Sequence, residues 1–218
     1  MRKPVTLIVV DDHPLFRHGL VSVLGNVPHF SVIGEAPSIG DAHTLIEQNQ
    51  PDILLVDISL GEENGLELVK SIKALYPEIS QIVVSMYDEV IYASSALKAG
   101  AKGYIMKQEA AETLLGAIDT VLQGKIYLSE AMRERMLDSM LSQKDDPQSD
   151  PVETLSVREH EVFRLIGRGY GVREIADTLN LSHKTINVYR DNIRRKLSIA
   201  DAGELRKYAI KWTKSKEM

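Results

Sequence analysis

The chain has 218 residues, 44% of them hydrophobic and 26% charged, a composition typical of a globular protein with one or two domains. It contains no cysteine, which excludes disulfides, cysteine-ligated zinc, iron–sulfur clusters and a cysteine nucleophile. No apolar run approaches the roughly 18 residues of a membrane span, and the run Val5–Val10 is too short for a signal peptide. We therefore expect a soluble, cytoplasmic protein.

The net charge of −5 conceals a division along the chain. Residues 1–153 carry 12 Lys/Arg and 23 Asp/Glu, a net charge of −11, whereas residues 154–218 carry 14 and 8, a net charge of +6. An acidic first part and a basic last part indicate two modules with different partners. The charge of the basic module favours a polyanionic partner.

The first part alternates short apolar runs with amphipathic stretches. Runs rich in Val and Ile, bounded by Gly, Pro or Asp, predict buried strands. These are Val5–Val10, Phe30–Gly34, Ile53–Asp57, Gln81–Ser85 and Gly103–Met106. Helices are predicted between and after them, at Pro14–Leu24, Ile39–Gln48, Gly65–Leu75, Glu89–Ala99 and Glu109–Gln123. Five βα repeats predict an α/β fold with a doubly wound, five-stranded parallel sheet over residues 1–126.

A connection with a different composition follows. A helix is predicted at residues 129–141, and residues 143–153 form an acidic stretch with two prolines and a single hydrophobic side chain, which predicts a flexible linker. We therefore treat residues 127–153 as the connection between two domains. Residues 154–218 show no strand pattern, and a capping box at Ser156 and Glu159 opens the first of four predicted helices. These helices cover residues 157–167, 172–179, 183–197 and 202–213.

Polar side chains stand at the ends of the predicted strands. Ligands of open α/β sheets bind at the carboxyl ends of the strands. Asp11 and Asp12 end the first run, Asp57 the third and Ser85 the fourth, and Lys107 follows the fifth. Clustered carboxylates favour a cation, and oxygen ligands suit Mg²⁺, for which Mn²⁺ can substitute. A carboxylate can also serve as a nucleophile toward phosphorus, so the cluster predicts phosphoryl transfer to Asp57.

These residues and their surroundings resemble a two-component receiver domain. The resemblance rests on Val9 to Pro14, Leu54 to Asp57, Gly65, Val84-Ser85 and Ala99 to Lys107. It implies that Asp57 is the phospho-acceptor. It also implies that Asp11, Asp12, Asp57 and the backbone carbonyl of Ser59 hold Mg²⁺. Lys107 then pairs with the phosphoryl group, Ser85 is the switch hydroxyl, and Tyr104 is its aromatic partner.

The chain departs from the receiver pattern in two places. Gln108 stands where many receivers have a proline that supports a cis peptide, and a cis bond before a non-proline residue is costly. Leu60-Gly61 replaces the Met-Pro of many relatives, and the loop from Gly61 to Asn64 is acidic. Ser59 and Tyr87 occupy positions that tune dephosphorylation in receivers.

The third helix of the last part carries two distinct stripes. Ile186, Tyr189, Ile193 and Leu197 fall on one face, as a core stripe would. The opposite face holds Lys184, Asn187, Val188, Asp191 and Arg195, with Arg194 beside it. Cations for phosphates, an amide for adenine and an apolar group for a thymine methyl suit a recognition helix in the major groove.

This part is similar to the LuxR-type helix-turn-helix through Leu155 to Val162, Glu174 to Ala176, Leu181-Ser182, Lys184 to Ile186 and Asn192 to Leu197. Both modules together resemble the NarL/FixJ class of response regulators. The expected DNA-contacting residues are Lys184, Asn187, Val188, Arg190, Arg194 and Arg195. Asn187 replaces a common lysine, and Asp191 is an acidic residue on the DNA-facing stripe. The last helix is expected to form the dimer contact on DNA.

The sequence therefore predicts a transcription factor that a histidine kinase or a small phosphodonor controls by phosphorylating Asp57. We expect it to bind promoter DNA as a homodimer and not to act as an enzyme or on a membrane. Two alternatives remain open. A Mg²⁺-dependent phosphohydrolase of the haloacid dehalogenase class would need an aspartate where Ser59 stands. A regulator with a vestigial receiver would bind DNA independently of phosphorylation.

Overall fold

The computed structural model describes residues 3–61, 63–109, 111–141, 151–179 and 181–216. The chain divides into two compact units, Met1–Lys144 and Asp145–Met218, and each has its own hydrophobic core. Part of the predicted linker, residues 143–150, lies outside the described residues.

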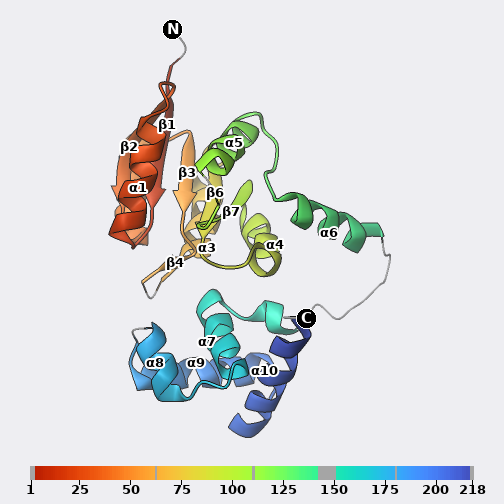
Figure 1. Cartoon of the computed structure of the whole chain (residues 1–218). Coiled ribbons are helices and arrows are strands. Elements are labelled where there is room, and N and C mark those ends of the chain that lie inside the picture. The colour runs from red at the N-terminus through yellow and green to blue at the C-terminus, as the bar shows by residue number, and fades with distance from the viewer. Residues whose placement is uncertain (1–2, 62, 110, 142–150, 180, 217–218) are drawn as a thin grey trace. The chain divides into compact units, whose positions relative to one another are not determined.

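A five-stranded parallel sheet forms the centre of the first unit (Figure 1). Its strands are β1 (Val5–Val10), β2 (Phe30–Ala36), β3 (Ile53–Val56), β6 (Ser80–Ser85) and β7 (Gly103–Met106). Their order is β2-β1-β3-β6-β7, so the chain reverses direction across the sheet beside β1. The predicted doubly wound α/β fold is thereby confirmed. All four residues of β3 are buried, as the continuous apolar run predicts for a strand covered on both faces.

Helices cover both faces of this sheet. They are α1 (Pro14–Gly25), α2 (Ile39–Asn49), α3 (Gly65–Leu75), α4 (Glu89–Ala99) and α5 (Ala111–Leu122). One core cluster joins alternate strand residues such as Leu7, Val9 and Leu55 to Leu24 of α1 and Ile118 of α5. Because side chains alternate along a strand, the other strand residues face α2, α3 and α4. The sheet is thus buried between two helical layers, with the strand ends left to carry polar groups.

A short hairpin follows β3. Strands β4 (Ser59–Leu60) and β5 (Glu63–Asn64) pair in an antiparallel manner, with Ser59 opposite Asn64. Gly61 takes a positive φ of 61° in the turn, a conformation that favours glycine. The sequence predicts only an acidic loop from Gly61 to Asn64, because two-residue strands have no detectable periodicity.

The segment after α5 returns to the edge of the sheet. Tyr127 forms an isolated parallel bridge with Gly103 of β7, and its amide donates to the carbonyl of Lys102 at 2.8 Å. Further along, the amide of Ser129 donates to the buried carboxylate of Glu89 at 2.9 Å. Helix α6 (Glu130–Leu141) then begins, with Met132 buried. The connection therefore starts as an ordered part of the first unit.

The second unit consists of helices in the part that the structure describes. A 3-10 helix (Pro151–Thr154) precedes α7 (Val157–Gly167), α8 (Val172–Leu179), α9 (His183–Lys196) and α10 (Ala202–Lys216). The predicted capping box is present, because Ser156 and Glu159 cap each other's backbone amides at the start of α7. In the described chain, no helix is long and apolar enough to cross a membrane.

Two predicted boundaries need correction. The sequence predicts Val152 to lie in the flexible linker, but Val152 is 1% exposed and belongs to the second core. Because the residues around Val152 are mostly acidic residues and prolines, the composition of the segment predicts a linker and does not reveal this single core position. The helix predicted from Glu109 begins at Ala111 instead, and the Glu109 amide donates to the Met106 carbonyl in a turn.

Candidate phosphorylation site and nucleic-acid interface

Two aspartates follow adjacent strands at the carboxyl edge of the sheet. Asp11 comes directly after β1 and Asp57 directly after β3, and these strands pair in parallel with Val10 opposite Val56. The Asp57 amide donates to the Val10 carbonyl at 2.8 Å, which continues the ladder up to the aspartate itself. Both side chains are buried. The structure thus brings these residues together as the sequence predicts.

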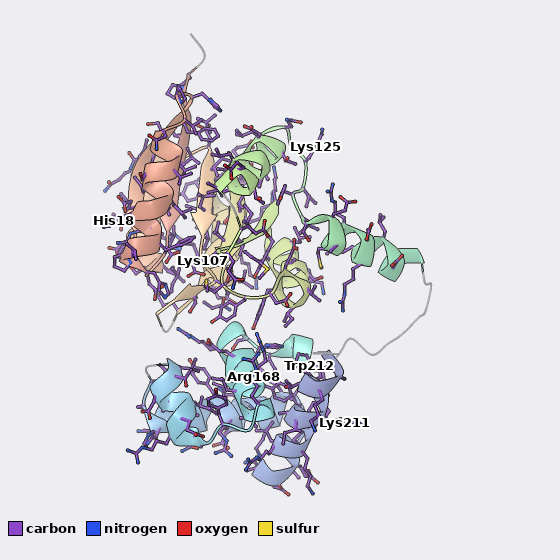
Figure 2. All side chains as sticks on the ribbon, viewed as in Figure 1. His18, Lys107, Lys125, Arg168, Lys211 and Trp212 are labelled. Atoms are coloured by element: carbon purple, nitrogen blue, oxygen red, sulfur yellow. The ribbon has the colours of Figure 1, made fainter. Side chains whose placement is uncertain are left out.

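Lys107 lies between these carboxylates. Its Nζ is 2.6 Å from Oδ2 of Asp11 and 2.7 Å from Oδ2 of Asp57, and the lysine side chain is 3% exposed. The Lys107 backbone amide donates to the Ser85 carbonyl at 2.7 Å, which fixes the start of this side chain at the strand end. Figure 2 shows Lys107 inside the first unit, whereas Lys125 lies on its outside. One ammonium therefore offsets part of the charge of two buried carboxylates.

The Asp57 carboxyl has an unusual acidity. Burial raises its pKa to about 6, although the Lys107 ammonium beside it and a hydrogen bond from the Ser59 amide act in the opposite direction. The negative charge of Asp11 contributes a smaller increase. At neutral pH the carboxylate is thus ionised but poorly solvated, which suits a nucleophile and a cation ligand.

Asp12 and His13 extend the cluster toward solvent. Nδ1 of His13 lies 2.7 Å from Oδ1 of Asp12 and 3.9 Å from Oδ2 of Asp57. One ligand atom from each of Asp11, Asp12, His13 and Asp57 lies within 4.8 Å of the others. Three carboxylates in such proximity form the hard oxygen donor set that Mg²⁺ prefers. The role of His13 is not predictable from the sequence, because a histidine after two aspartates has no distinctive spacing.

The hairpin fixes the neighbouring backbone. The Gly61 amide donates to Oδ2 of Asp12 at 2.8 Å, and the Ser59 amide donates to Oδ1 of Asp57 at 3.2 Å. Gly65 opens α3 directly against the site, and a Cβ built on it would lie 1.9 Å from the Asp57 carbonyl oxygen. Only glycine fits at position 65. Its motif is visible in the sequence, but the steric reason for it is not.

Ser85 and Tyr104 form a second polar group on the adjacent strands. Ser85 is fully buried, and its Oγ accepts a hydrogen bond from the Tyr87 amide at 3.3 Å. The Tyr104 hydroxyl donates to the Tyr87 carbonyl at 3.0 Å. Burial raises the pKa of Tyr104 far above its ordinary range, although a hydrogen bond with Ser85 opposes this effect. The two predicted switch residues thus contact each other through one buried network.

The peptide bond between Lys107 and Gln108 is trans.

Helix α9 carries the predicted recognition residues in the second unit. Ser182 caps its start by accepting from the Thr185 amide at 3.0 Å. Ile186 and Ile193 are buried, and Tyr189 and Leu197 pack against the same core. Lys184, Asn187, Val188, Asp191 and Arg195 are all exposed. The helix therefore presents the stripe that was expected to face DNA.

The arginines of α9 differ in the partners that their guanidinium groups contact. The Arg194 guanidinium is partly buried, lies 3.2 Å from Oδ1 of Asp191 and also donates to the Ala200 carbonyl. Arg190 donates to Oδ1 of Asn187 at 3.3 Å, and Arg195 donates to Oδ1 of Asn192 at 2.7 Å. Asp191 is thus partly neutralised from within its own helix. Arg194 also connects the helix to the following loop.

Two families match the two parts of the chain. Residues 7–119 match the response regulator receiver domain, and residues 153–209 match the bacterial regulatory proteins of the luxR family. The chain belongs to the response regulators, with a receiver and a LuxR-type DNA-binding domain. The family supports a transcriptional regulator rather than an enzyme, so the phosphohydrolase alternative has no support from its relatives.

Full-length relatives have the same organisation. The oxygen regulatory protein NreC of Staphylococcus haemolyticus is 33% identical over 94% of this chain and 96% of its own. The transcriptional regulatory protein DegU of Brevibacillus brevis is 30% identical over 96% and 95%. RcsB from Salmonella enterica serovar Typhimurium, solved on promoter rprA with the phosphomimetic BeF3⁻, is 27% identical. The TM-score is 0.59, and the match covers 95% of this chain and 98% of that chain.

Proposed function

We propose that this response regulator is switched by phosphorylation of Asp57 and then acts on promoter DNA. The observation that carries the proposal is the Lys107 ammonium held within 2.7 Å of two buried carboxylates, Asp11 and Asp57. A pocket with this arrangement can bring a carboxylate nucleophile, a cation site and a phosphate-pairing ammonium to the same atoms.

In the transfer step, a carboxylate oxygen of Asp57 forms a bond to phosphorus. The bond from phosphorus to the donor nitrogen breaks, and the nitrogen leaves with the electron pair and takes a proton. The donor is a phosphohistidine of a histidine kinase or a small phosphoramidate. Lys107 pairs with the phosphoryl oxygens. Ser85 then hydrogen-bonds another oxygen, and Tyr104, whose side chain is already buried, acts as its switch partner.

The residues present fit Mg²⁺, with Mn²⁺ as a substitute. Asp11, Asp12 and Asp57 are oxygen donors grouped at one strand edge, and together with the Ser59 carbonyl they would hold the ion. When bound, Mg²⁺ supplies positive charge to the incoming phosphoryl group. Lys107 already offsets part of the negative charge of the same cluster, because its Nζ lies within 2.7 Å of both Asp11 and Asp57.

The second unit supplies the output. We infer that Lys184, Asn187, Val188, Arg190, Arg194 and Arg195 contact DNA. The exposed stripe of α9, opposite its buried Ile186 and Ile193, supports this assignment. Arg194 donates to the Ala200 carbonyl, and we expect its guanidinium to contact a phosphate as well. A homodimer with α10 at the contact between the copies would place two such helices on paired half-sites.

The test combines labelling with DNA selection. The native protein and Asp57→Ala are treated with phosphoramidate and Mg²⁺, and phosphate incorporation is measured by intact mass. The same samples are then used to select DNA fragments from a genomic pool. We expect one phosphate on the native chain, none on Asp57→Ala, and tighter selective binding only after labelling. A native chain that stays unlabelled yet selects the same fragments would support the vestigial-receiver alternative.

A further inference from the structure

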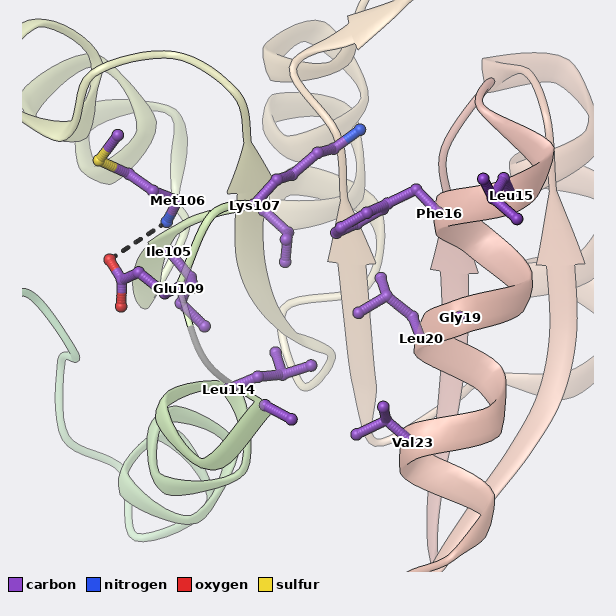
Figure 3. A pocket seen from close by; sticks show the side chains of 12 residues that line it. Leu15, Phe16, Gly19, Leu20, Val23, Ile105, Met106, Lys107, Glu109 and Leu114 are labelled. Atoms are coloured by element: carbon purple, nitrogen blue, oxygen red, sulfur yellow. Dashed lines mark hydrogen bonds between the residues drawn. The ribbon is translucent and has the colours of Figure 1, made fainter.

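Phe16 of α1 contacts the Lys107 side chain from the side of the sheet that carries α1 and α5. The Lys107 Nζ lies 4.5 Å from the centroid of the Phe16 ring. Figure 3 shows Phe16 extending from α1 toward Lys107, with Leu20 and Val23 further along the same helix. An ammonium at this distance from an aromatic ring is attracted by the negative face of the ring.

The three contacts of the ammonium differ in what happens to them during phosphoryl transfer. Asp57 is the reactant, and its carboxyl loses its negative charge when one oxygen is esterified to phosphorus. Asp11 is a proposed cation ligand, so a bound ion would compete with Lys107 for its oxygens. Among the described residues, the ring of Phe16 is the third contact of this ammonium. It is neither consumed nor shared.

The space around the ring makes its position consequential. Phe16 and Lys107 both line a mainly apolar cavity of about 390 Å³ between α1, α5 and the end of β7. The side chain of lysine has a flexible four-carbon stem, and the cavity offers the Lys107 side chain room to move away from the carboxylates. The Phe16 ring forms the part of the cavity wall next to the ammonium.

We propose that Phe16 is a positioning residue for phosphoryl transfer to Asp57, because its ring holds the Lys107 ammonium while the carboxylate partners change. This inference rests on the proposed function. The ring keeps the ammonium near the phosphoryl oxygens at the stage when Asp57 no longer attracts it. The electrostatic attraction of the ring face is what acts, in addition to the volume of the side chain.

The experiment varies the electrostatics of the ring at constant shape. Residue 16 is replaced in the full chain by phenylalanine carrying one, two and three ring fluorines, which weaken the negative face stepwise. The rate of phosphorylation by phosphoramidate is measured at saturating Mg²⁺. We expect a stepwise decrease that totals about three- to tenfold across the series. A rate that does not change across the series would overturn the proposal, even if Phe16→Leu is slow or fails to fold.

A matched control removes apolar volume without altering the ring. Leu20 lies one turn further along α1 and lines the same cavity. Leu20→Ala is expected to lower stability but to leave the phosphorylation rate at saturating Mg²⁺ unchanged. A rate loss in Leu20→Ala equal to that of the trifluorinated protein would assign the effect to packing and refute the positioning role. A native chain with no phosphorylation at all would instead remove the proposed function, and the inference with it.

Discussion

At the scale of single residues, the site depends on placing charge where water is scarce. The Asp57 carboxyl is 3% exposed, and burial raises its pKa to about 6 despite the nearby Lys107 ammonium. The ordinary value of 3.8 applies to the unfolded chain. The folded protein therefore holds the Asp57 proton more tightly than the unfolded chain does. This gives a stability contribution that is present below the unfolded pKa and lost as the pH rises through the folded pKa.

We expect this loss to be measurable as a difference between the native chain and Asp57→Asn, which does not titrate at this position. Without divalent cations, the free energy of unfolding of the native first unit should fall relative to the variant by up to about 3 kcal/mol between about pH 4 and pH 7. Chemical unfolding followed by circular dichroism measures it. The single tryptophan, Trp212, lies on α10 in the second unit, so its fluorescence should show no such difference (Figure 2).

Glycine 65 illustrates a steric requirement at the same site. An alanine Cβ would lie 1.9 Å from the Asp57 carbonyl oxygen, so either the start of α3 or the acceptor backbone must move. We expect Gly65→Ala to lower the free energy of unfolding by more than about 2 kcal/mol and to reduce phosphorylation strongly.

Gly116 provides the matched comparison for this change. It lies within α5, and a Cβ built on it would meet nothing within 4 Å. Gly116→Ala should therefore stabilise the chain by about 0.5–1 kcal/mol through helix propensity and leave phosphorylation unchanged. Equal effects of the two substitutions would contradict the steric account.

At the scale of elements, α9 combines side chains with separable tasks. Lys184 is exposed in the first turn and has the chemistry for a phosphate, whereas the Asn187 amide has the chemistry for an adenine edge. Asp191 does not oppose DNA with its full charge, because Arg194 lies 3.2 Å from it. The acidic residue on the basic face is thus compatible with the proposed interface.

These tasks predict different outcomes for two alanine substitutions. Lys184→Ala should weaken binding to all sequences alike and reduce the slope of log affinity against log salt by about 1. Asn187→Ala should leave that slope nearly unchanged and reduce discrimination at one base pair by about 1–3 kcal/mol. Titrations at several salt concentrations, with a selected site and its single-base variants, measure both. A salt slope altered equally by both variants would contradict the assignment.

The elements also show what the sequence could predict. Buried strands such as β1 and β3 are continuous apolar runs. Their residues, and the polar groups at their ends, can therefore be identified from the sequence alone. The β4–β5 hairpin has two residues in each strand and no period to detect. Val152 is a lone apolar residue among acidic ones. For Phe16, the sequence predicts only that it belongs to an amphipathic helix. Their roles arise from contacts between distant segments, which no local pattern contains.

At the scale of the whole molecule, the two units have separate cores, one around the sheet and one around Phe163 and Ile186. We expect residues 145–218 to fold without the first unit, because the second core is completed by its own helices. The isolated fragment should show a cooperative thermal transition and the Trp212 emission of a partly buried indole. A fragment with a random-coil spectrum would show that the second core needs the receiver for its stability.

The bridge between Tyr127 and Gly103 has a consequence for how the chain can be divided. Strand β7 is the last strand of its sheet, and unpaired amides and carbonyls on such a strand can recruit strands from other molecules. Tyr127 already occupies the Lys102 carbonyl and the Tyr104 amide. A fragment that ends at residue 126, where the strand and helix pattern stops, would uncover both groups. Its self-association and precipitation would then reflect an unprotected sheet edge rather than any loss of signalling.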